Sequence, residues 1–294
     1  MENKWFKTLQ FITLPTMSIN NQIIEDNRTL YDSIGNTYPA AESVSITTEI
    51  INNIKCHWFH PENSKPNELV FYIHGGGYAI GSFQSHKAMV SHFAKGLGRT
   101  ILFITYALAP ERPYPNGLND ILSVYEYASQ KFPMHHFYLF GDSAGGGLVI
   151  ASVNEINKKN WKTPKAVSLI SPWYNLETNN PSSDLRQHLD SILSKEMVKN
   201  FAYAYAGTQL SAADPSQLSF TTFPPVFIGV GTNEILFDDA MNFYDMVYQI
   251  QPNSQIKIYG GEGHVWTQLN ISSHSAKDLI MNIDHFFNNT TDRE

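Results

Sequence analysis

Residues 137–147 join an apolar strand-like run, F-Y-L-F, to the pattern G-D-S-A-G and then to an apolar helix-like segment. Gly141 and Gly145 suit a turn so tight that a Cβ would clash with neighbouring backbone, and glycine also tolerates positive φ. A strand–turn–helix of this kind presents the hydroxyl of Ser143 at the carboxyl end of a sheet, where ligands bind in open α/β folds. Ser143 is therefore a candidate nucleophile, and it requires a base, an acid and oxyanion donors elsewhere in the chain.

Strand and helix signals alternate from about residue 45 onward, which predicts a mainly parallel sheet wrapped by helices, an α/β fold. Residues 44–49 and 54–59 are expected to form an antiparallel hairpin ahead of it. Buried strands are expected at 69–73, 101–106, 137–140, 166–170, 226–230 and 255–259. Helices are expected at 85–97, 117–131, 144–157, 238–250 and 273–287.

One segment interrupts this alternation. Residues 181–222 contain a helical pattern at 194–206 and turn residues, but no strand signal. We expect residues 1–44 and 181–222 to form a helical cap over the carboxyl edge of the sheet. Residues 45–180 and 223–294 then make up the catalytic core.

The candidate base is His264. It lies in Y-G-G-E-G-H-V-W, directly after the last expected strand and before the last helix, and the glycines allow this loop to reach back to the turn at Ser143. In α/β-hydrolases the order along the chain is nucleophile, acid, histidine, which favours His264. The alternative is a solvent-facing loop histidine. His274 and His285 also come late, but they fall within or beside the final helix.

The candidate acid lies after the strand expected at 226–230. Glu234 falls nearest the strand end, where a carboxylate would accept the imidazole Nδ1–H and hold the histidine in the required tautomer. Asp238 and Asp239 coincide with the start of the following helix, where carboxylates complement the helix dipole. Glu234 is the preferred acid and Asp238 is the alternative.

The candidate oxyanion hole is the sequence H-G-G-G at 74–77, directly after the strand expected at 69–73. Its glycines leave the backbone N–H groups of Gly76 and Gly77 free to face a developing negative charge. The N–H of Ala144, the residue after the nucleophile, is the third donor. A phosphate-binding loop would require a lysine and a serine or threonine after the glycines, whereas Y-A-I follows here.

Composition restricts the remaining function classes. A net charge of −7 argues against a nucleic-acid partner, and no apolar run approaches the roughly 18 residues of a membrane span. Cys56 is the only cysteine, so no intramolecular disulfide forms, which suits a cytoplasmic location. The apolar stretch at 9–15 is short and interrupted, and is interpreted as an amphipathic helix rather than a signal peptide. No metal-ligand pattern or cofactor motif is present, so neither group is expected.

These motifs together resemble the hormone-sensitive-lipase-like family of microbial esterases, the α/β-hydrolase fold-3 group. The resemblance covers most of the chain, from about residue 69 to about residue 287. The segments that carry it are H-G-G-G-Y at 74–78, Y-A-L-A-P-E-R-P-Y-P at 106–115, G-D-S-A-G-G at 141–146, S-P-W-Y-N-L at 171–176 and G-H-V-W at 263–266.

The resemblance implies roles for supporting residues. Glu111 takes the position of the family glutamate that braces the oxyanion loop, and His74, Gly75 and Asp142 belong to the two glycine motifs. Three positions depart from the family pattern: Ala107 replaces an arginine, Asn175 replaces an aspartate, and the acid is glutamate instead of aspartate.

The resemblance implies a carboxylesterase that hydrolyses small, short-acyl esters with a Ser-His-Glu triad. It also makes a homodimer one assembly to expect. An amidase, an arylformamidase or an acyltransferase would use the same triad, and a non-catalytic ligand-binding homologue is a further alternative. Several aromatic side chains either line the substrate pocket or simply pack near it: Tyr78, Trp173, Tyr174, Tyr203, Tyr205 and Trp266.

Overall fold

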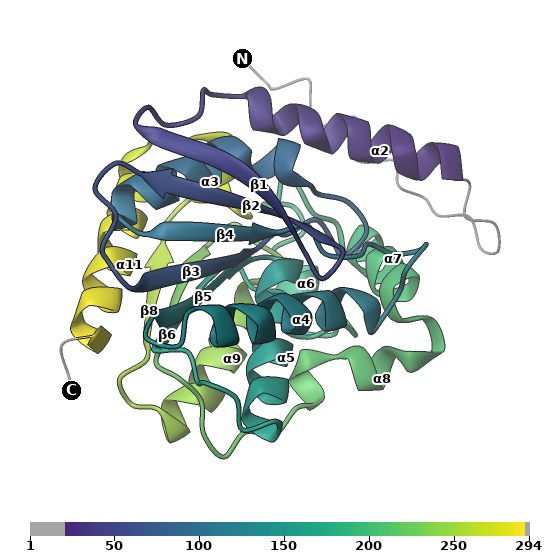
Figure 1. Cartoon of the computed structure of the whole chain (residues 1–294). Coiled ribbons are helices and arrows are strands. Elements are labelled where there is room, and N and C mark those ends of the chain that lie inside the picture. The colour runs from purple at the N-terminus through teal and green to yellow at the C-terminus, as the bar shows by residue number, and fades with distance from the viewer. Residues whose placement is uncertain (1–20, 292–294) are drawn as a thin grey trace.

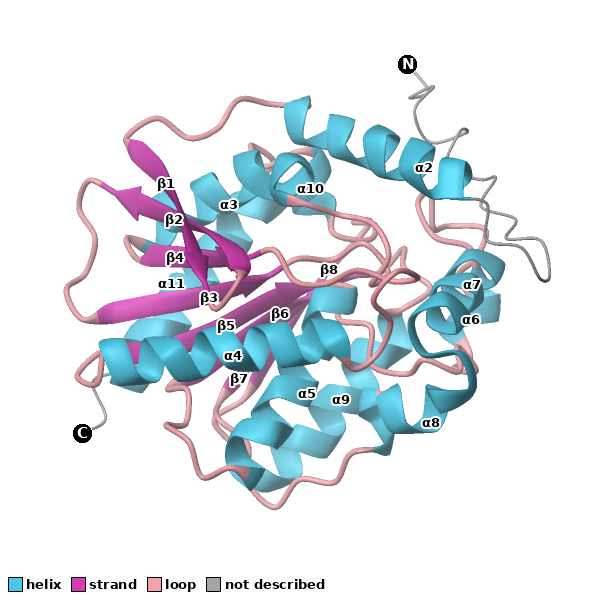
Figure 2. Ribbon diagram, turned by 45° about the vertical axis from the view of Figure 1, so that its right-hand side comes forward, coloured by secondary structure: helices cyan, strands magenta, loops and turns pink. Residues whose placement is uncertain are grey.

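Eight strands form one sheet in the order β1-β2-β4-β3-β5-β6-β7-β8 (Figures 1 and 2). This computed structural model describes residues 21–291. The strands are β1 Val44–Ile51, β2 Ile54–Pro61, β3 Glu68–Ile73, β4 Thr100–Ile104, β5 His136–Asp142, β6 Ala166–Ile170, β7 Val226–Gly231 and β8 Gln255–Tyr259. Strand β2 pairs antiparallel with β1 and with β4, and all later neighbours pair in parallel. The predicted hairpin and parallel sheet are therefore confirmed.

The strands are apolar on both faces because helices cover both sides of the sheet. In β3, Phe71 and Ile73 pack with the cluster that contains residues of α4, α5 and α9. The alternate residues Val70 and Tyr72 pack with residues of α3 and α11 on the opposite face. This alternation follows from the two-residue period of a strand, in which successive side chains point to opposite faces.

The helices that flank the sheet match the expected segments to within a few residues. They are α3 Phe83–Leu97, α4 Asn116–Lys131, α5 Ala144–Lys158, α9 Phe237–Ile250 and α11 His274–Thr291. Helix α3 begins with a capping box, in which Ser82 and Ser85 exchange side-chain and backbone hydrogen bonds. Gly98 ends the helix in the left-handed conformation, with φ of 56°.

The strand-free segment contains short helices beyond the carboxyl ends of the parallel strands (Figure 2). These elements are α6 Ser182–Leu185, α7 Lys195–Ala206, η2 Gly207–Gln209, α8 Leu210–Ala213 and η3 Pro215–Gln217. Ser194 is the N-cap of α7, and its side chain accepts a hydrogen bond from the N–H of Met197. The helical pattern expected at 194–206 is therefore present as α7.

The N-terminal part of the structure begins with α2 Asn21–Ser33, followed by η1 Ile34–Asn36. The amphipathic helix expected near residues 9–15 lies outside the described residues. The short helix α10 Trp266–Leu269, directly after the His264 loop, was not predicted.

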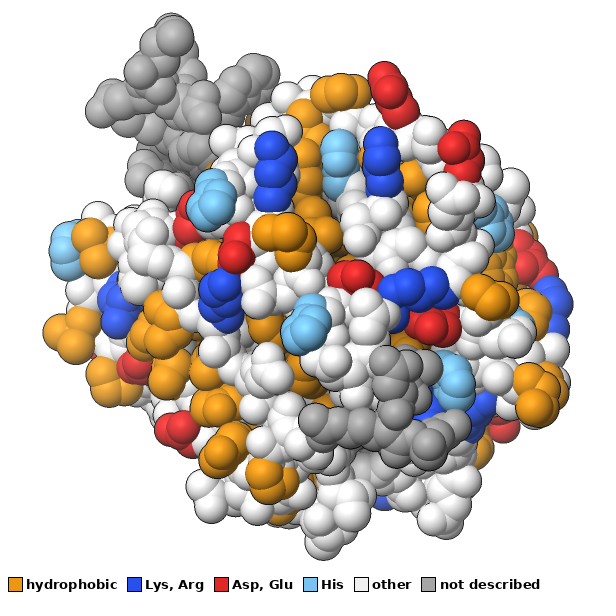
Figure 3. Space-filling view, turned by 90° about the vertical axis from the view of Figure 1, so that its left-hand side faces the viewer, with side chains coloured by type: hydrophobic (Ala, Val, Ile, Leu, Met, Phe, Trp, Pro, Cys, Tyr) orange, Lys and Arg blue, Asp and Glu red, His pale blue; other side chains and the backbone are white. Residues whose placement is uncertain are grey.

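The face seen in Figure 3 carries basic and acidic side chains interspersed among apolar ones. Within residues 21–291, no helix is both long enough and apolar enough to cross a lipid bilayer.

Candidate active site

The turn between β5 and α5 holds Ser143 in a strained backbone conformation, with φ of 51° and ψ of −124°. The N–H of Ser143 donates to Ile170 O at 2.9 Å. A Cβ on Gly145 would overlap the carbonyl oxygens of Ile73 and His74, which belong to the neighbouring strand and its loop. Glycine is required there because those backbone atoms have no freedom to move away, and the turn consequently exposes the Ser143 hydroxyl at the strand end.

The structure brings Ser143, His264 and Glu234 into one hydrogen-bonded chain. The Ser143 hydroxyl lies 2.8 Å from His264 Nε2, and His264 Nδ1 lies 3.1 Å from Glu234 Oε2. The two partners arrive on loops that follow β8 and β7 respectively. All three side chains are buried, with exposed fractions of 7%, 5% and 0%. The arrangement is suited to removing a proton from the hydroxyl as it attacks a carbonyl carbon.

Ser171 is a functional neighbour that the sequence did not single out. Its hydroxyl donates to Glu234 Oε1 at 2.8 Å and accepts from the N–H of Val265 at 3.2 Å. Gly231 N also donates to Glu234 Oε1, at 2.6 Å. One serine therefore holds the acid and the residue after the histidine together. The available signal was its place directly after a buried strand, at the start of the S-P-W-Y-N-L segment.

The charge of Glu234 sets the protonation of the histidine. Burial by itself lowers the pKa of the His264 imidazole, but the hydrogen bond and the negative charge of Glu234 outweigh burial and raise it above its usual value. Burial likewise raises the pKa of the Glu234 carboxyl, against the hydrogen bonds it accepts from His264, Gly231 and Ser171. The adjacent carboxylate is thus placed to stabilise an imidazolium at His264.

Asp238, the alternative acid, is directed elsewhere. It lies in the first turn of α9, and its carboxylate accepts from the N–H of Ser182 at 2.7 Å. Asp239 accepts from the N–H groups of Tyr174 and Asn175, at 3.0 and 2.6 Å. These two carboxylates therefore anchor the segment that leads into residues 181–222, whereas Glu234 contacts His264.

The H-G-G-G loop after β3 contains three consecutive residues with positive φ: Gly76 at 111°, Gly77 at 59° and Tyr78 at 61°. The carbonyl of Gly76 accepts from the N–H groups of Ala79 and Ile80, which closes the turn. Within residues 21–291, the N–H groups of Gly76 and Gly77 have no hydrogen-bond acceptor. The N–H of Ala144 lies in the first turn of α5, where backbone donors have no helical partner.

Asp142 connects the turn at Ser143 to this loop. Its Oδ1 accepts from Tyr72 Oη at 2.7 Å and from Gly75 N at 3.1 Å. His86 Nε2 lies 3.5 Å from the other carboxylate oxygen. Burial alone would raise the pKa of the Asp142 carboxyl, but His86 and the Tyr72 hydroxyl hold it below its usual value. Asp142 is therefore a buried carboxylate that remains ionised and fixes the start of the oxyanion loop.

His74 is a packing and hydrogen-bonding residue of the same loop. Its Nδ1–H donates to Gly75 O at 2.8 Å, and its ring stacks on Tyr106 with a centroid distance of 4.3 Å. Burial lowers the pKa of His74 to about 3, so the ring is neutral near pH 7. The ring lies behind the loop as a support and is not part of the chain of hydrogen bonds through Ser143.

Among the described residues, the contact of Glu111 with the H-G-G-G loop runs through Arg28 of α2. Both carboxylate oxygens accept from the Arg28 guanidinium at 2.8 Å. Arg28 also donates to the carbonyl oxygens of Ala79 and Ala109, each at 3.0 Å. The expected support of the loop by Glu111 is thus indirect, and Arg28 is the residue that sequence reasoning missed. The Glu111 side chain is itself half exposed.

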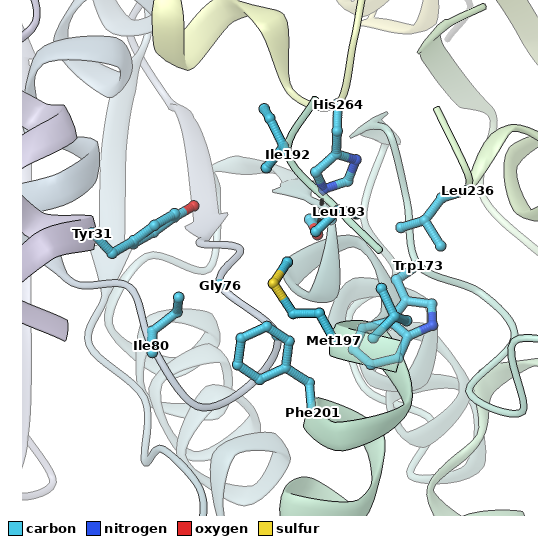
Figure 4. A pocket seen from close by; sticks show the side chains of 13 residues that line it. Tyr31, Gly76, Ile80, Trp173, Ile192, Leu193, Met197, Phe201, Leu236 and His264 are labelled. Carbon is cyan, nitrogen blue, oxygen red and sulfur yellow. Dashed lines mark hydrogen bonds between the residues drawn. The ribbon is translucent and has the colours of Figure 1, made fainter. Parts of the chain in front are cut away.

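A small cavity opens above Ser143, and its walls are almost entirely apolar (Figure 4). Helix α7 contributes Met197, Val198 and Phe201, and Tyr31 of α2 also lines the cavity. Of the aromatic residues considered from the sequence, Trp173 lines this cavity and Tyr203 is exposed. Among the described residues, no group of His, Cys, Asp or Glu side chains is arranged to hold a metal ion.

The family model for the alpha/beta hydrolase fold matches residues 70–268, about two thirds of the chain. This chain belongs to the alpha/beta hydrolase fold family. An acetyl-hydrolase from Streptomyces hygroscopicus is 31% identical over 229 residues, which cover 75% of each chain. An esterase from Acinetobacter venetianus is 26% identical over 279 residues, covering 93% of this chain and 92% of the relative.

A solved structure supports the same assignment within the alpha/beta hydrolases. An esterase described as a member of the bacterial hormone-sensitive lipase family superposes with a TM-score of 0.88. It is 26% identical in sequence, and the match covers 97% of this chain and 95% of that one. Both the α/β-hydrolase fold and the resemblance to hormone-sensitive-lipase-like esterases are confirmed.

Proposed function

We propose that this chain is a carboxylic-ester hydrolase that cleaves small esters with short acyl groups through an acyl-enzyme on Ser143. The observation that carries this proposal is the chain of hydrogen bonds from Ser143 through His264 to Glu234, at 2.8 and 3.1 Å, beneath an apolar cavity. The free N–H groups of Gly76 and Gly77 border the same cavity. The matches to an esterase and an acetyl-hydrolase support the same reaction class.

In the proposed reaction, His264 Nε2 takes the proton of the Ser143 hydroxyl as its oxygen attacks the ester carbonyl carbon. Glu234 stabilises the imidazolium, and the N–H groups of Gly76, Gly77 and Ala144 bind the oxyanion of the tetrahedral intermediate. His264 then protonates the departing alcohol. Water subsequently attacks the acyl-serine with the same proton transfers, which releases the acid and regenerates the enzyme.

The size of the cavity supports short acyl groups. Its volume is about 40 Å³. A space this small favours acyl chains of a few carbons, from acetyl to butyryl, over longer ones. The walls formed by Trp173, Leu193, Met197 and Leu236 offer such a chain an apolar surface.

We also infer that residues 181–222 and the described part of 1–44 form a cap over the catalytic core. This inference is supported by four residues of these segments that line the cavity above Ser143: Tyr31, Met197, Val198 and Phe201.

We further propose a homodimer through β8, because Ile258 on this edge strand is 46% exposed. Light scattering coupled to size-exclusion chromatography tests it. The single buried cysteine, Cys56, supports a cytoplasmic location.

The experiment that tests the function is hydrolysis of p-nitrophenyl acetate, butyrate, octanoate and laurate by the wild type and by Ser143→Ala. Activity is expected to peak at acetate or butyrate, and the variant is expected to lose about 10⁶-fold in kcat. A folded wild type that is inactive on all four esters would overturn the proposal. Activity that survives in Ser143→Ala would overturn the assignment of the nucleophile.

A further inference from the structure

Tyr78 has an unusual position immediately after the oxyanion glycines. Its φ of 61° is uncommon for a residue with a bulky side chain, yet the ring is 1% exposed. The N–H of Ala109 donates to Tyr78 O at 2.9 Å, which fixes the peptide that follows the strained residue. Gly75, Gly76 and Gly77 have no side chains with which to hold themselves in place. Asp142 and the bonds to the Gly76 carbonyl hold the start of the loop, and the direction of the Gly76 and Gly77 N–H groups further depends on how firmly Tyr78 is held.

Two aromatic rings hold Tyr78 from different parts of the fold. The ring of Trp173 lies 5.2 Å away, centroid to centroid, and the backbone N–H of Trp173 donates to Ser143 O at 2.9 Å. Tyr205 of α7 stacks on Tyr78 at 3.9 Å with an interplanar angle of 11°. Tyr78 is thus packed between a residue attached to the nucleophile turn and a residue of the segment above the sheet.

Helix α7 contacts the oxyanion loop at a second point, one turn earlier. A Cβ on Gly77 would overlap the ring of Phe201, so this ring lies directly against the glycine backbone. Tyr205 is 4% exposed, and its carbonyl accepts from Tyr114 N at 2.8 Å, which anchors the end of α7. Phe201 and Tyr205 are four residues apart and therefore lie on one face of the helix. This face of α7 packs against the loop at Gly77 and Tyr78.

We propose that Tyr205 is a positioning residue for the oxyanion hole: by stacking on Tyr78 it keeps the N–H groups of Gly76 and Gly77 directed at the reacting carbonyl. Tyr205 does not line the cavity, and the ring stacked on it that adjoins the oxyanion glycines is that of Tyr78. The inference rests on the proposed hydrolase function. In this proposal, both the H-G-G-G loop and helix α7 determine the geometry of the oxyanion hole.

The test is a comparison of Tyr205→Leu with the wild type on p-nitrophenyl butyrate. Leucine keeps an apolar group in the helix but removes the stacked ring. We expect kcat to fall by roughly 10- to 100-fold with KM changed by less than about threefold, because a misplaced oxyanion donor weakens mainly the transition state. Inhibition by a phenylboronic acid, which forms a tetrahedral adduct with serine, should weaken by a similar factor.

Two further variants separate positioning from general destabilisation. Tyr205→Phe retains the ring and is expected to keep kcat within about twofold of the wild type, because the stack needs no hydroxyl. Tyr203→Leu makes the same substitution on the same helix at a side chain that is 69% exposed, and should leave kcat unchanged. If Tyr205→Leu does not fold, Tyr205→Met replaces it, because methionine fills irregular gaps in packing.

The outcomes distinguish this inference from the proposed function. An inactive but folded wild type would remove the hydrolase function itself. If the wild type is active, any of three results would overturn only the positioning role. They are an unimpaired Tyr205→Leu variant, a loss of kcat that persists in Tyr205→Phe, and a Tyr205→Leu variant with a raised KM at constant kcat. A loss of kcat together with weaker boronic-acid binding, restored by phenylalanine, supports it.

Discussion

Replacing Glu234 with glutamine tests the acid of the proposed triad through the geometry of its two oxygens. Oε1 accepts from Ser171 Oγ at 2.8 Å and from Gly231 N at 2.6 Å, while Oε2 faces His264 Nδ1 at 3.1 Å. A glutamine amide has only one acceptor oxygen. To keep Ser171 and Gly231 paired, that oxygen must occupy the Oε1 position, which turns the NH₂ group towards His264.

An NH₂ group facing Nδ1 requires Nδ1 to be the acceptor, so the imidazole proton moves to Nε2. His264 Nε2 then donates to Ser143 in place of accepting its proton, and the base is lost. A comparable tautomer error in a serine protease lowers kcat by about 10⁴-fold, which corresponds to about 5.4 kcal/mol of activation free energy. We expect a loss of this order for Glu234→Gln with p-nitrophenyl butyrate.

Asp238→Asn is the matched control because it makes the equivalent change four residues away, at a carboxylate bound to Ser182 N at 2.7 Å. It should retain kcat within about threefold, since its partner is a backbone N–H remote from the base. Circular dichroism and thermal melting show whether both variants are folded. The reasoning would be refuted by a folded Glu234→Gln enzyme that keeps more than about a tenth of the wild-type kcat. It would also be refuted if Asp238→Asn lowered kcat more than Glu234→Gln does.

Three other predictions follow from the surroundings of His264, Gly145 and Asp239. Because Glu234 raises the pKa of His264, whose neutral form is the base, kcat/KM should fall on acidification with a midpoint above 6.5, as measured in a pH–rate profile. Gly145→Ala should lose at least about 100-fold in activity, since its Cβ overlaps the carbonyl oxygen of Ile73 and displaces the nucleophile turn; a p-nitrophenyl ester assay on the folded variant measures this. Burial raises the pKa of Asp239 to about 7, so the folded state retains a proton that the unfolded state releases near pH 4. The contribution of Asp239 to the free energy of unfolding should therefore decrease as pH rises from about 4 to 7. Over that range the wild type should lose stability relative to Asp239→Asn, as measured in denaturant titrations at several pH values.

The strands were the most predictable part of the fold, because strands buried on both faces are continuous apolar runs. The segment expected at 69–73 forms β3, Glu68–Ile73, almost without change. The expectation at 101–106 extends too far: β4 ends at Ile104, and the N–H of Thr105 donates to Lys55 O at 3.0 Å as the chain leaves the parallel ladder. Apolar composition alone does not show where that pairing stops.

The candidate site was predictable where it depends on order along the chain and on turn chemistry. Ser143, His264 and Glu234 each follow a strand, so their loops meet at one edge of a parallel sheet. Position after the strand favoured Glu234 and left Asp238 as the alternative. In the structure α9 begins at Phe237, so Asp238 lies in its first turn and accepts a hydrogen bond from Ser182 N.

Other supporting residues have contact partners that no local sequence pattern identifies. Arg28 contacts a carboxylate 83 positions away, and Ser171 contacts one 63 positions away. The stack of Tyr205 on Tyr78 likewise joins separate segments of the chain. Such partners are determined by the tertiary fold, and short sequence patterns do not report them.

The turn at Ser143 and the H-G-G-G loop, the proposed nucleophile and oxyanion donors, share one structural origin, the pairing of β3 with β5. Ile73 lies opposite Gly141 in this parallel ladder, so the two turns leave the sheet at the same level. The close contact of Gly145 with the end of β3 and the bond from Gly75 N to Asp142 at 3.1 Å then fix one turn against the other. Strained residues of this kind persist only when their surroundings over-determine them. The core meets that condition for Ser143, whereas Tyr78, one step further from the sheet, also requires the aromatic face of α7. Errors in the core pairing should therefore abolish the reaction, whereas displacement of α7 should weaken the oxyanion hole while leaving the Ser143–His264 hydrogen bond intact.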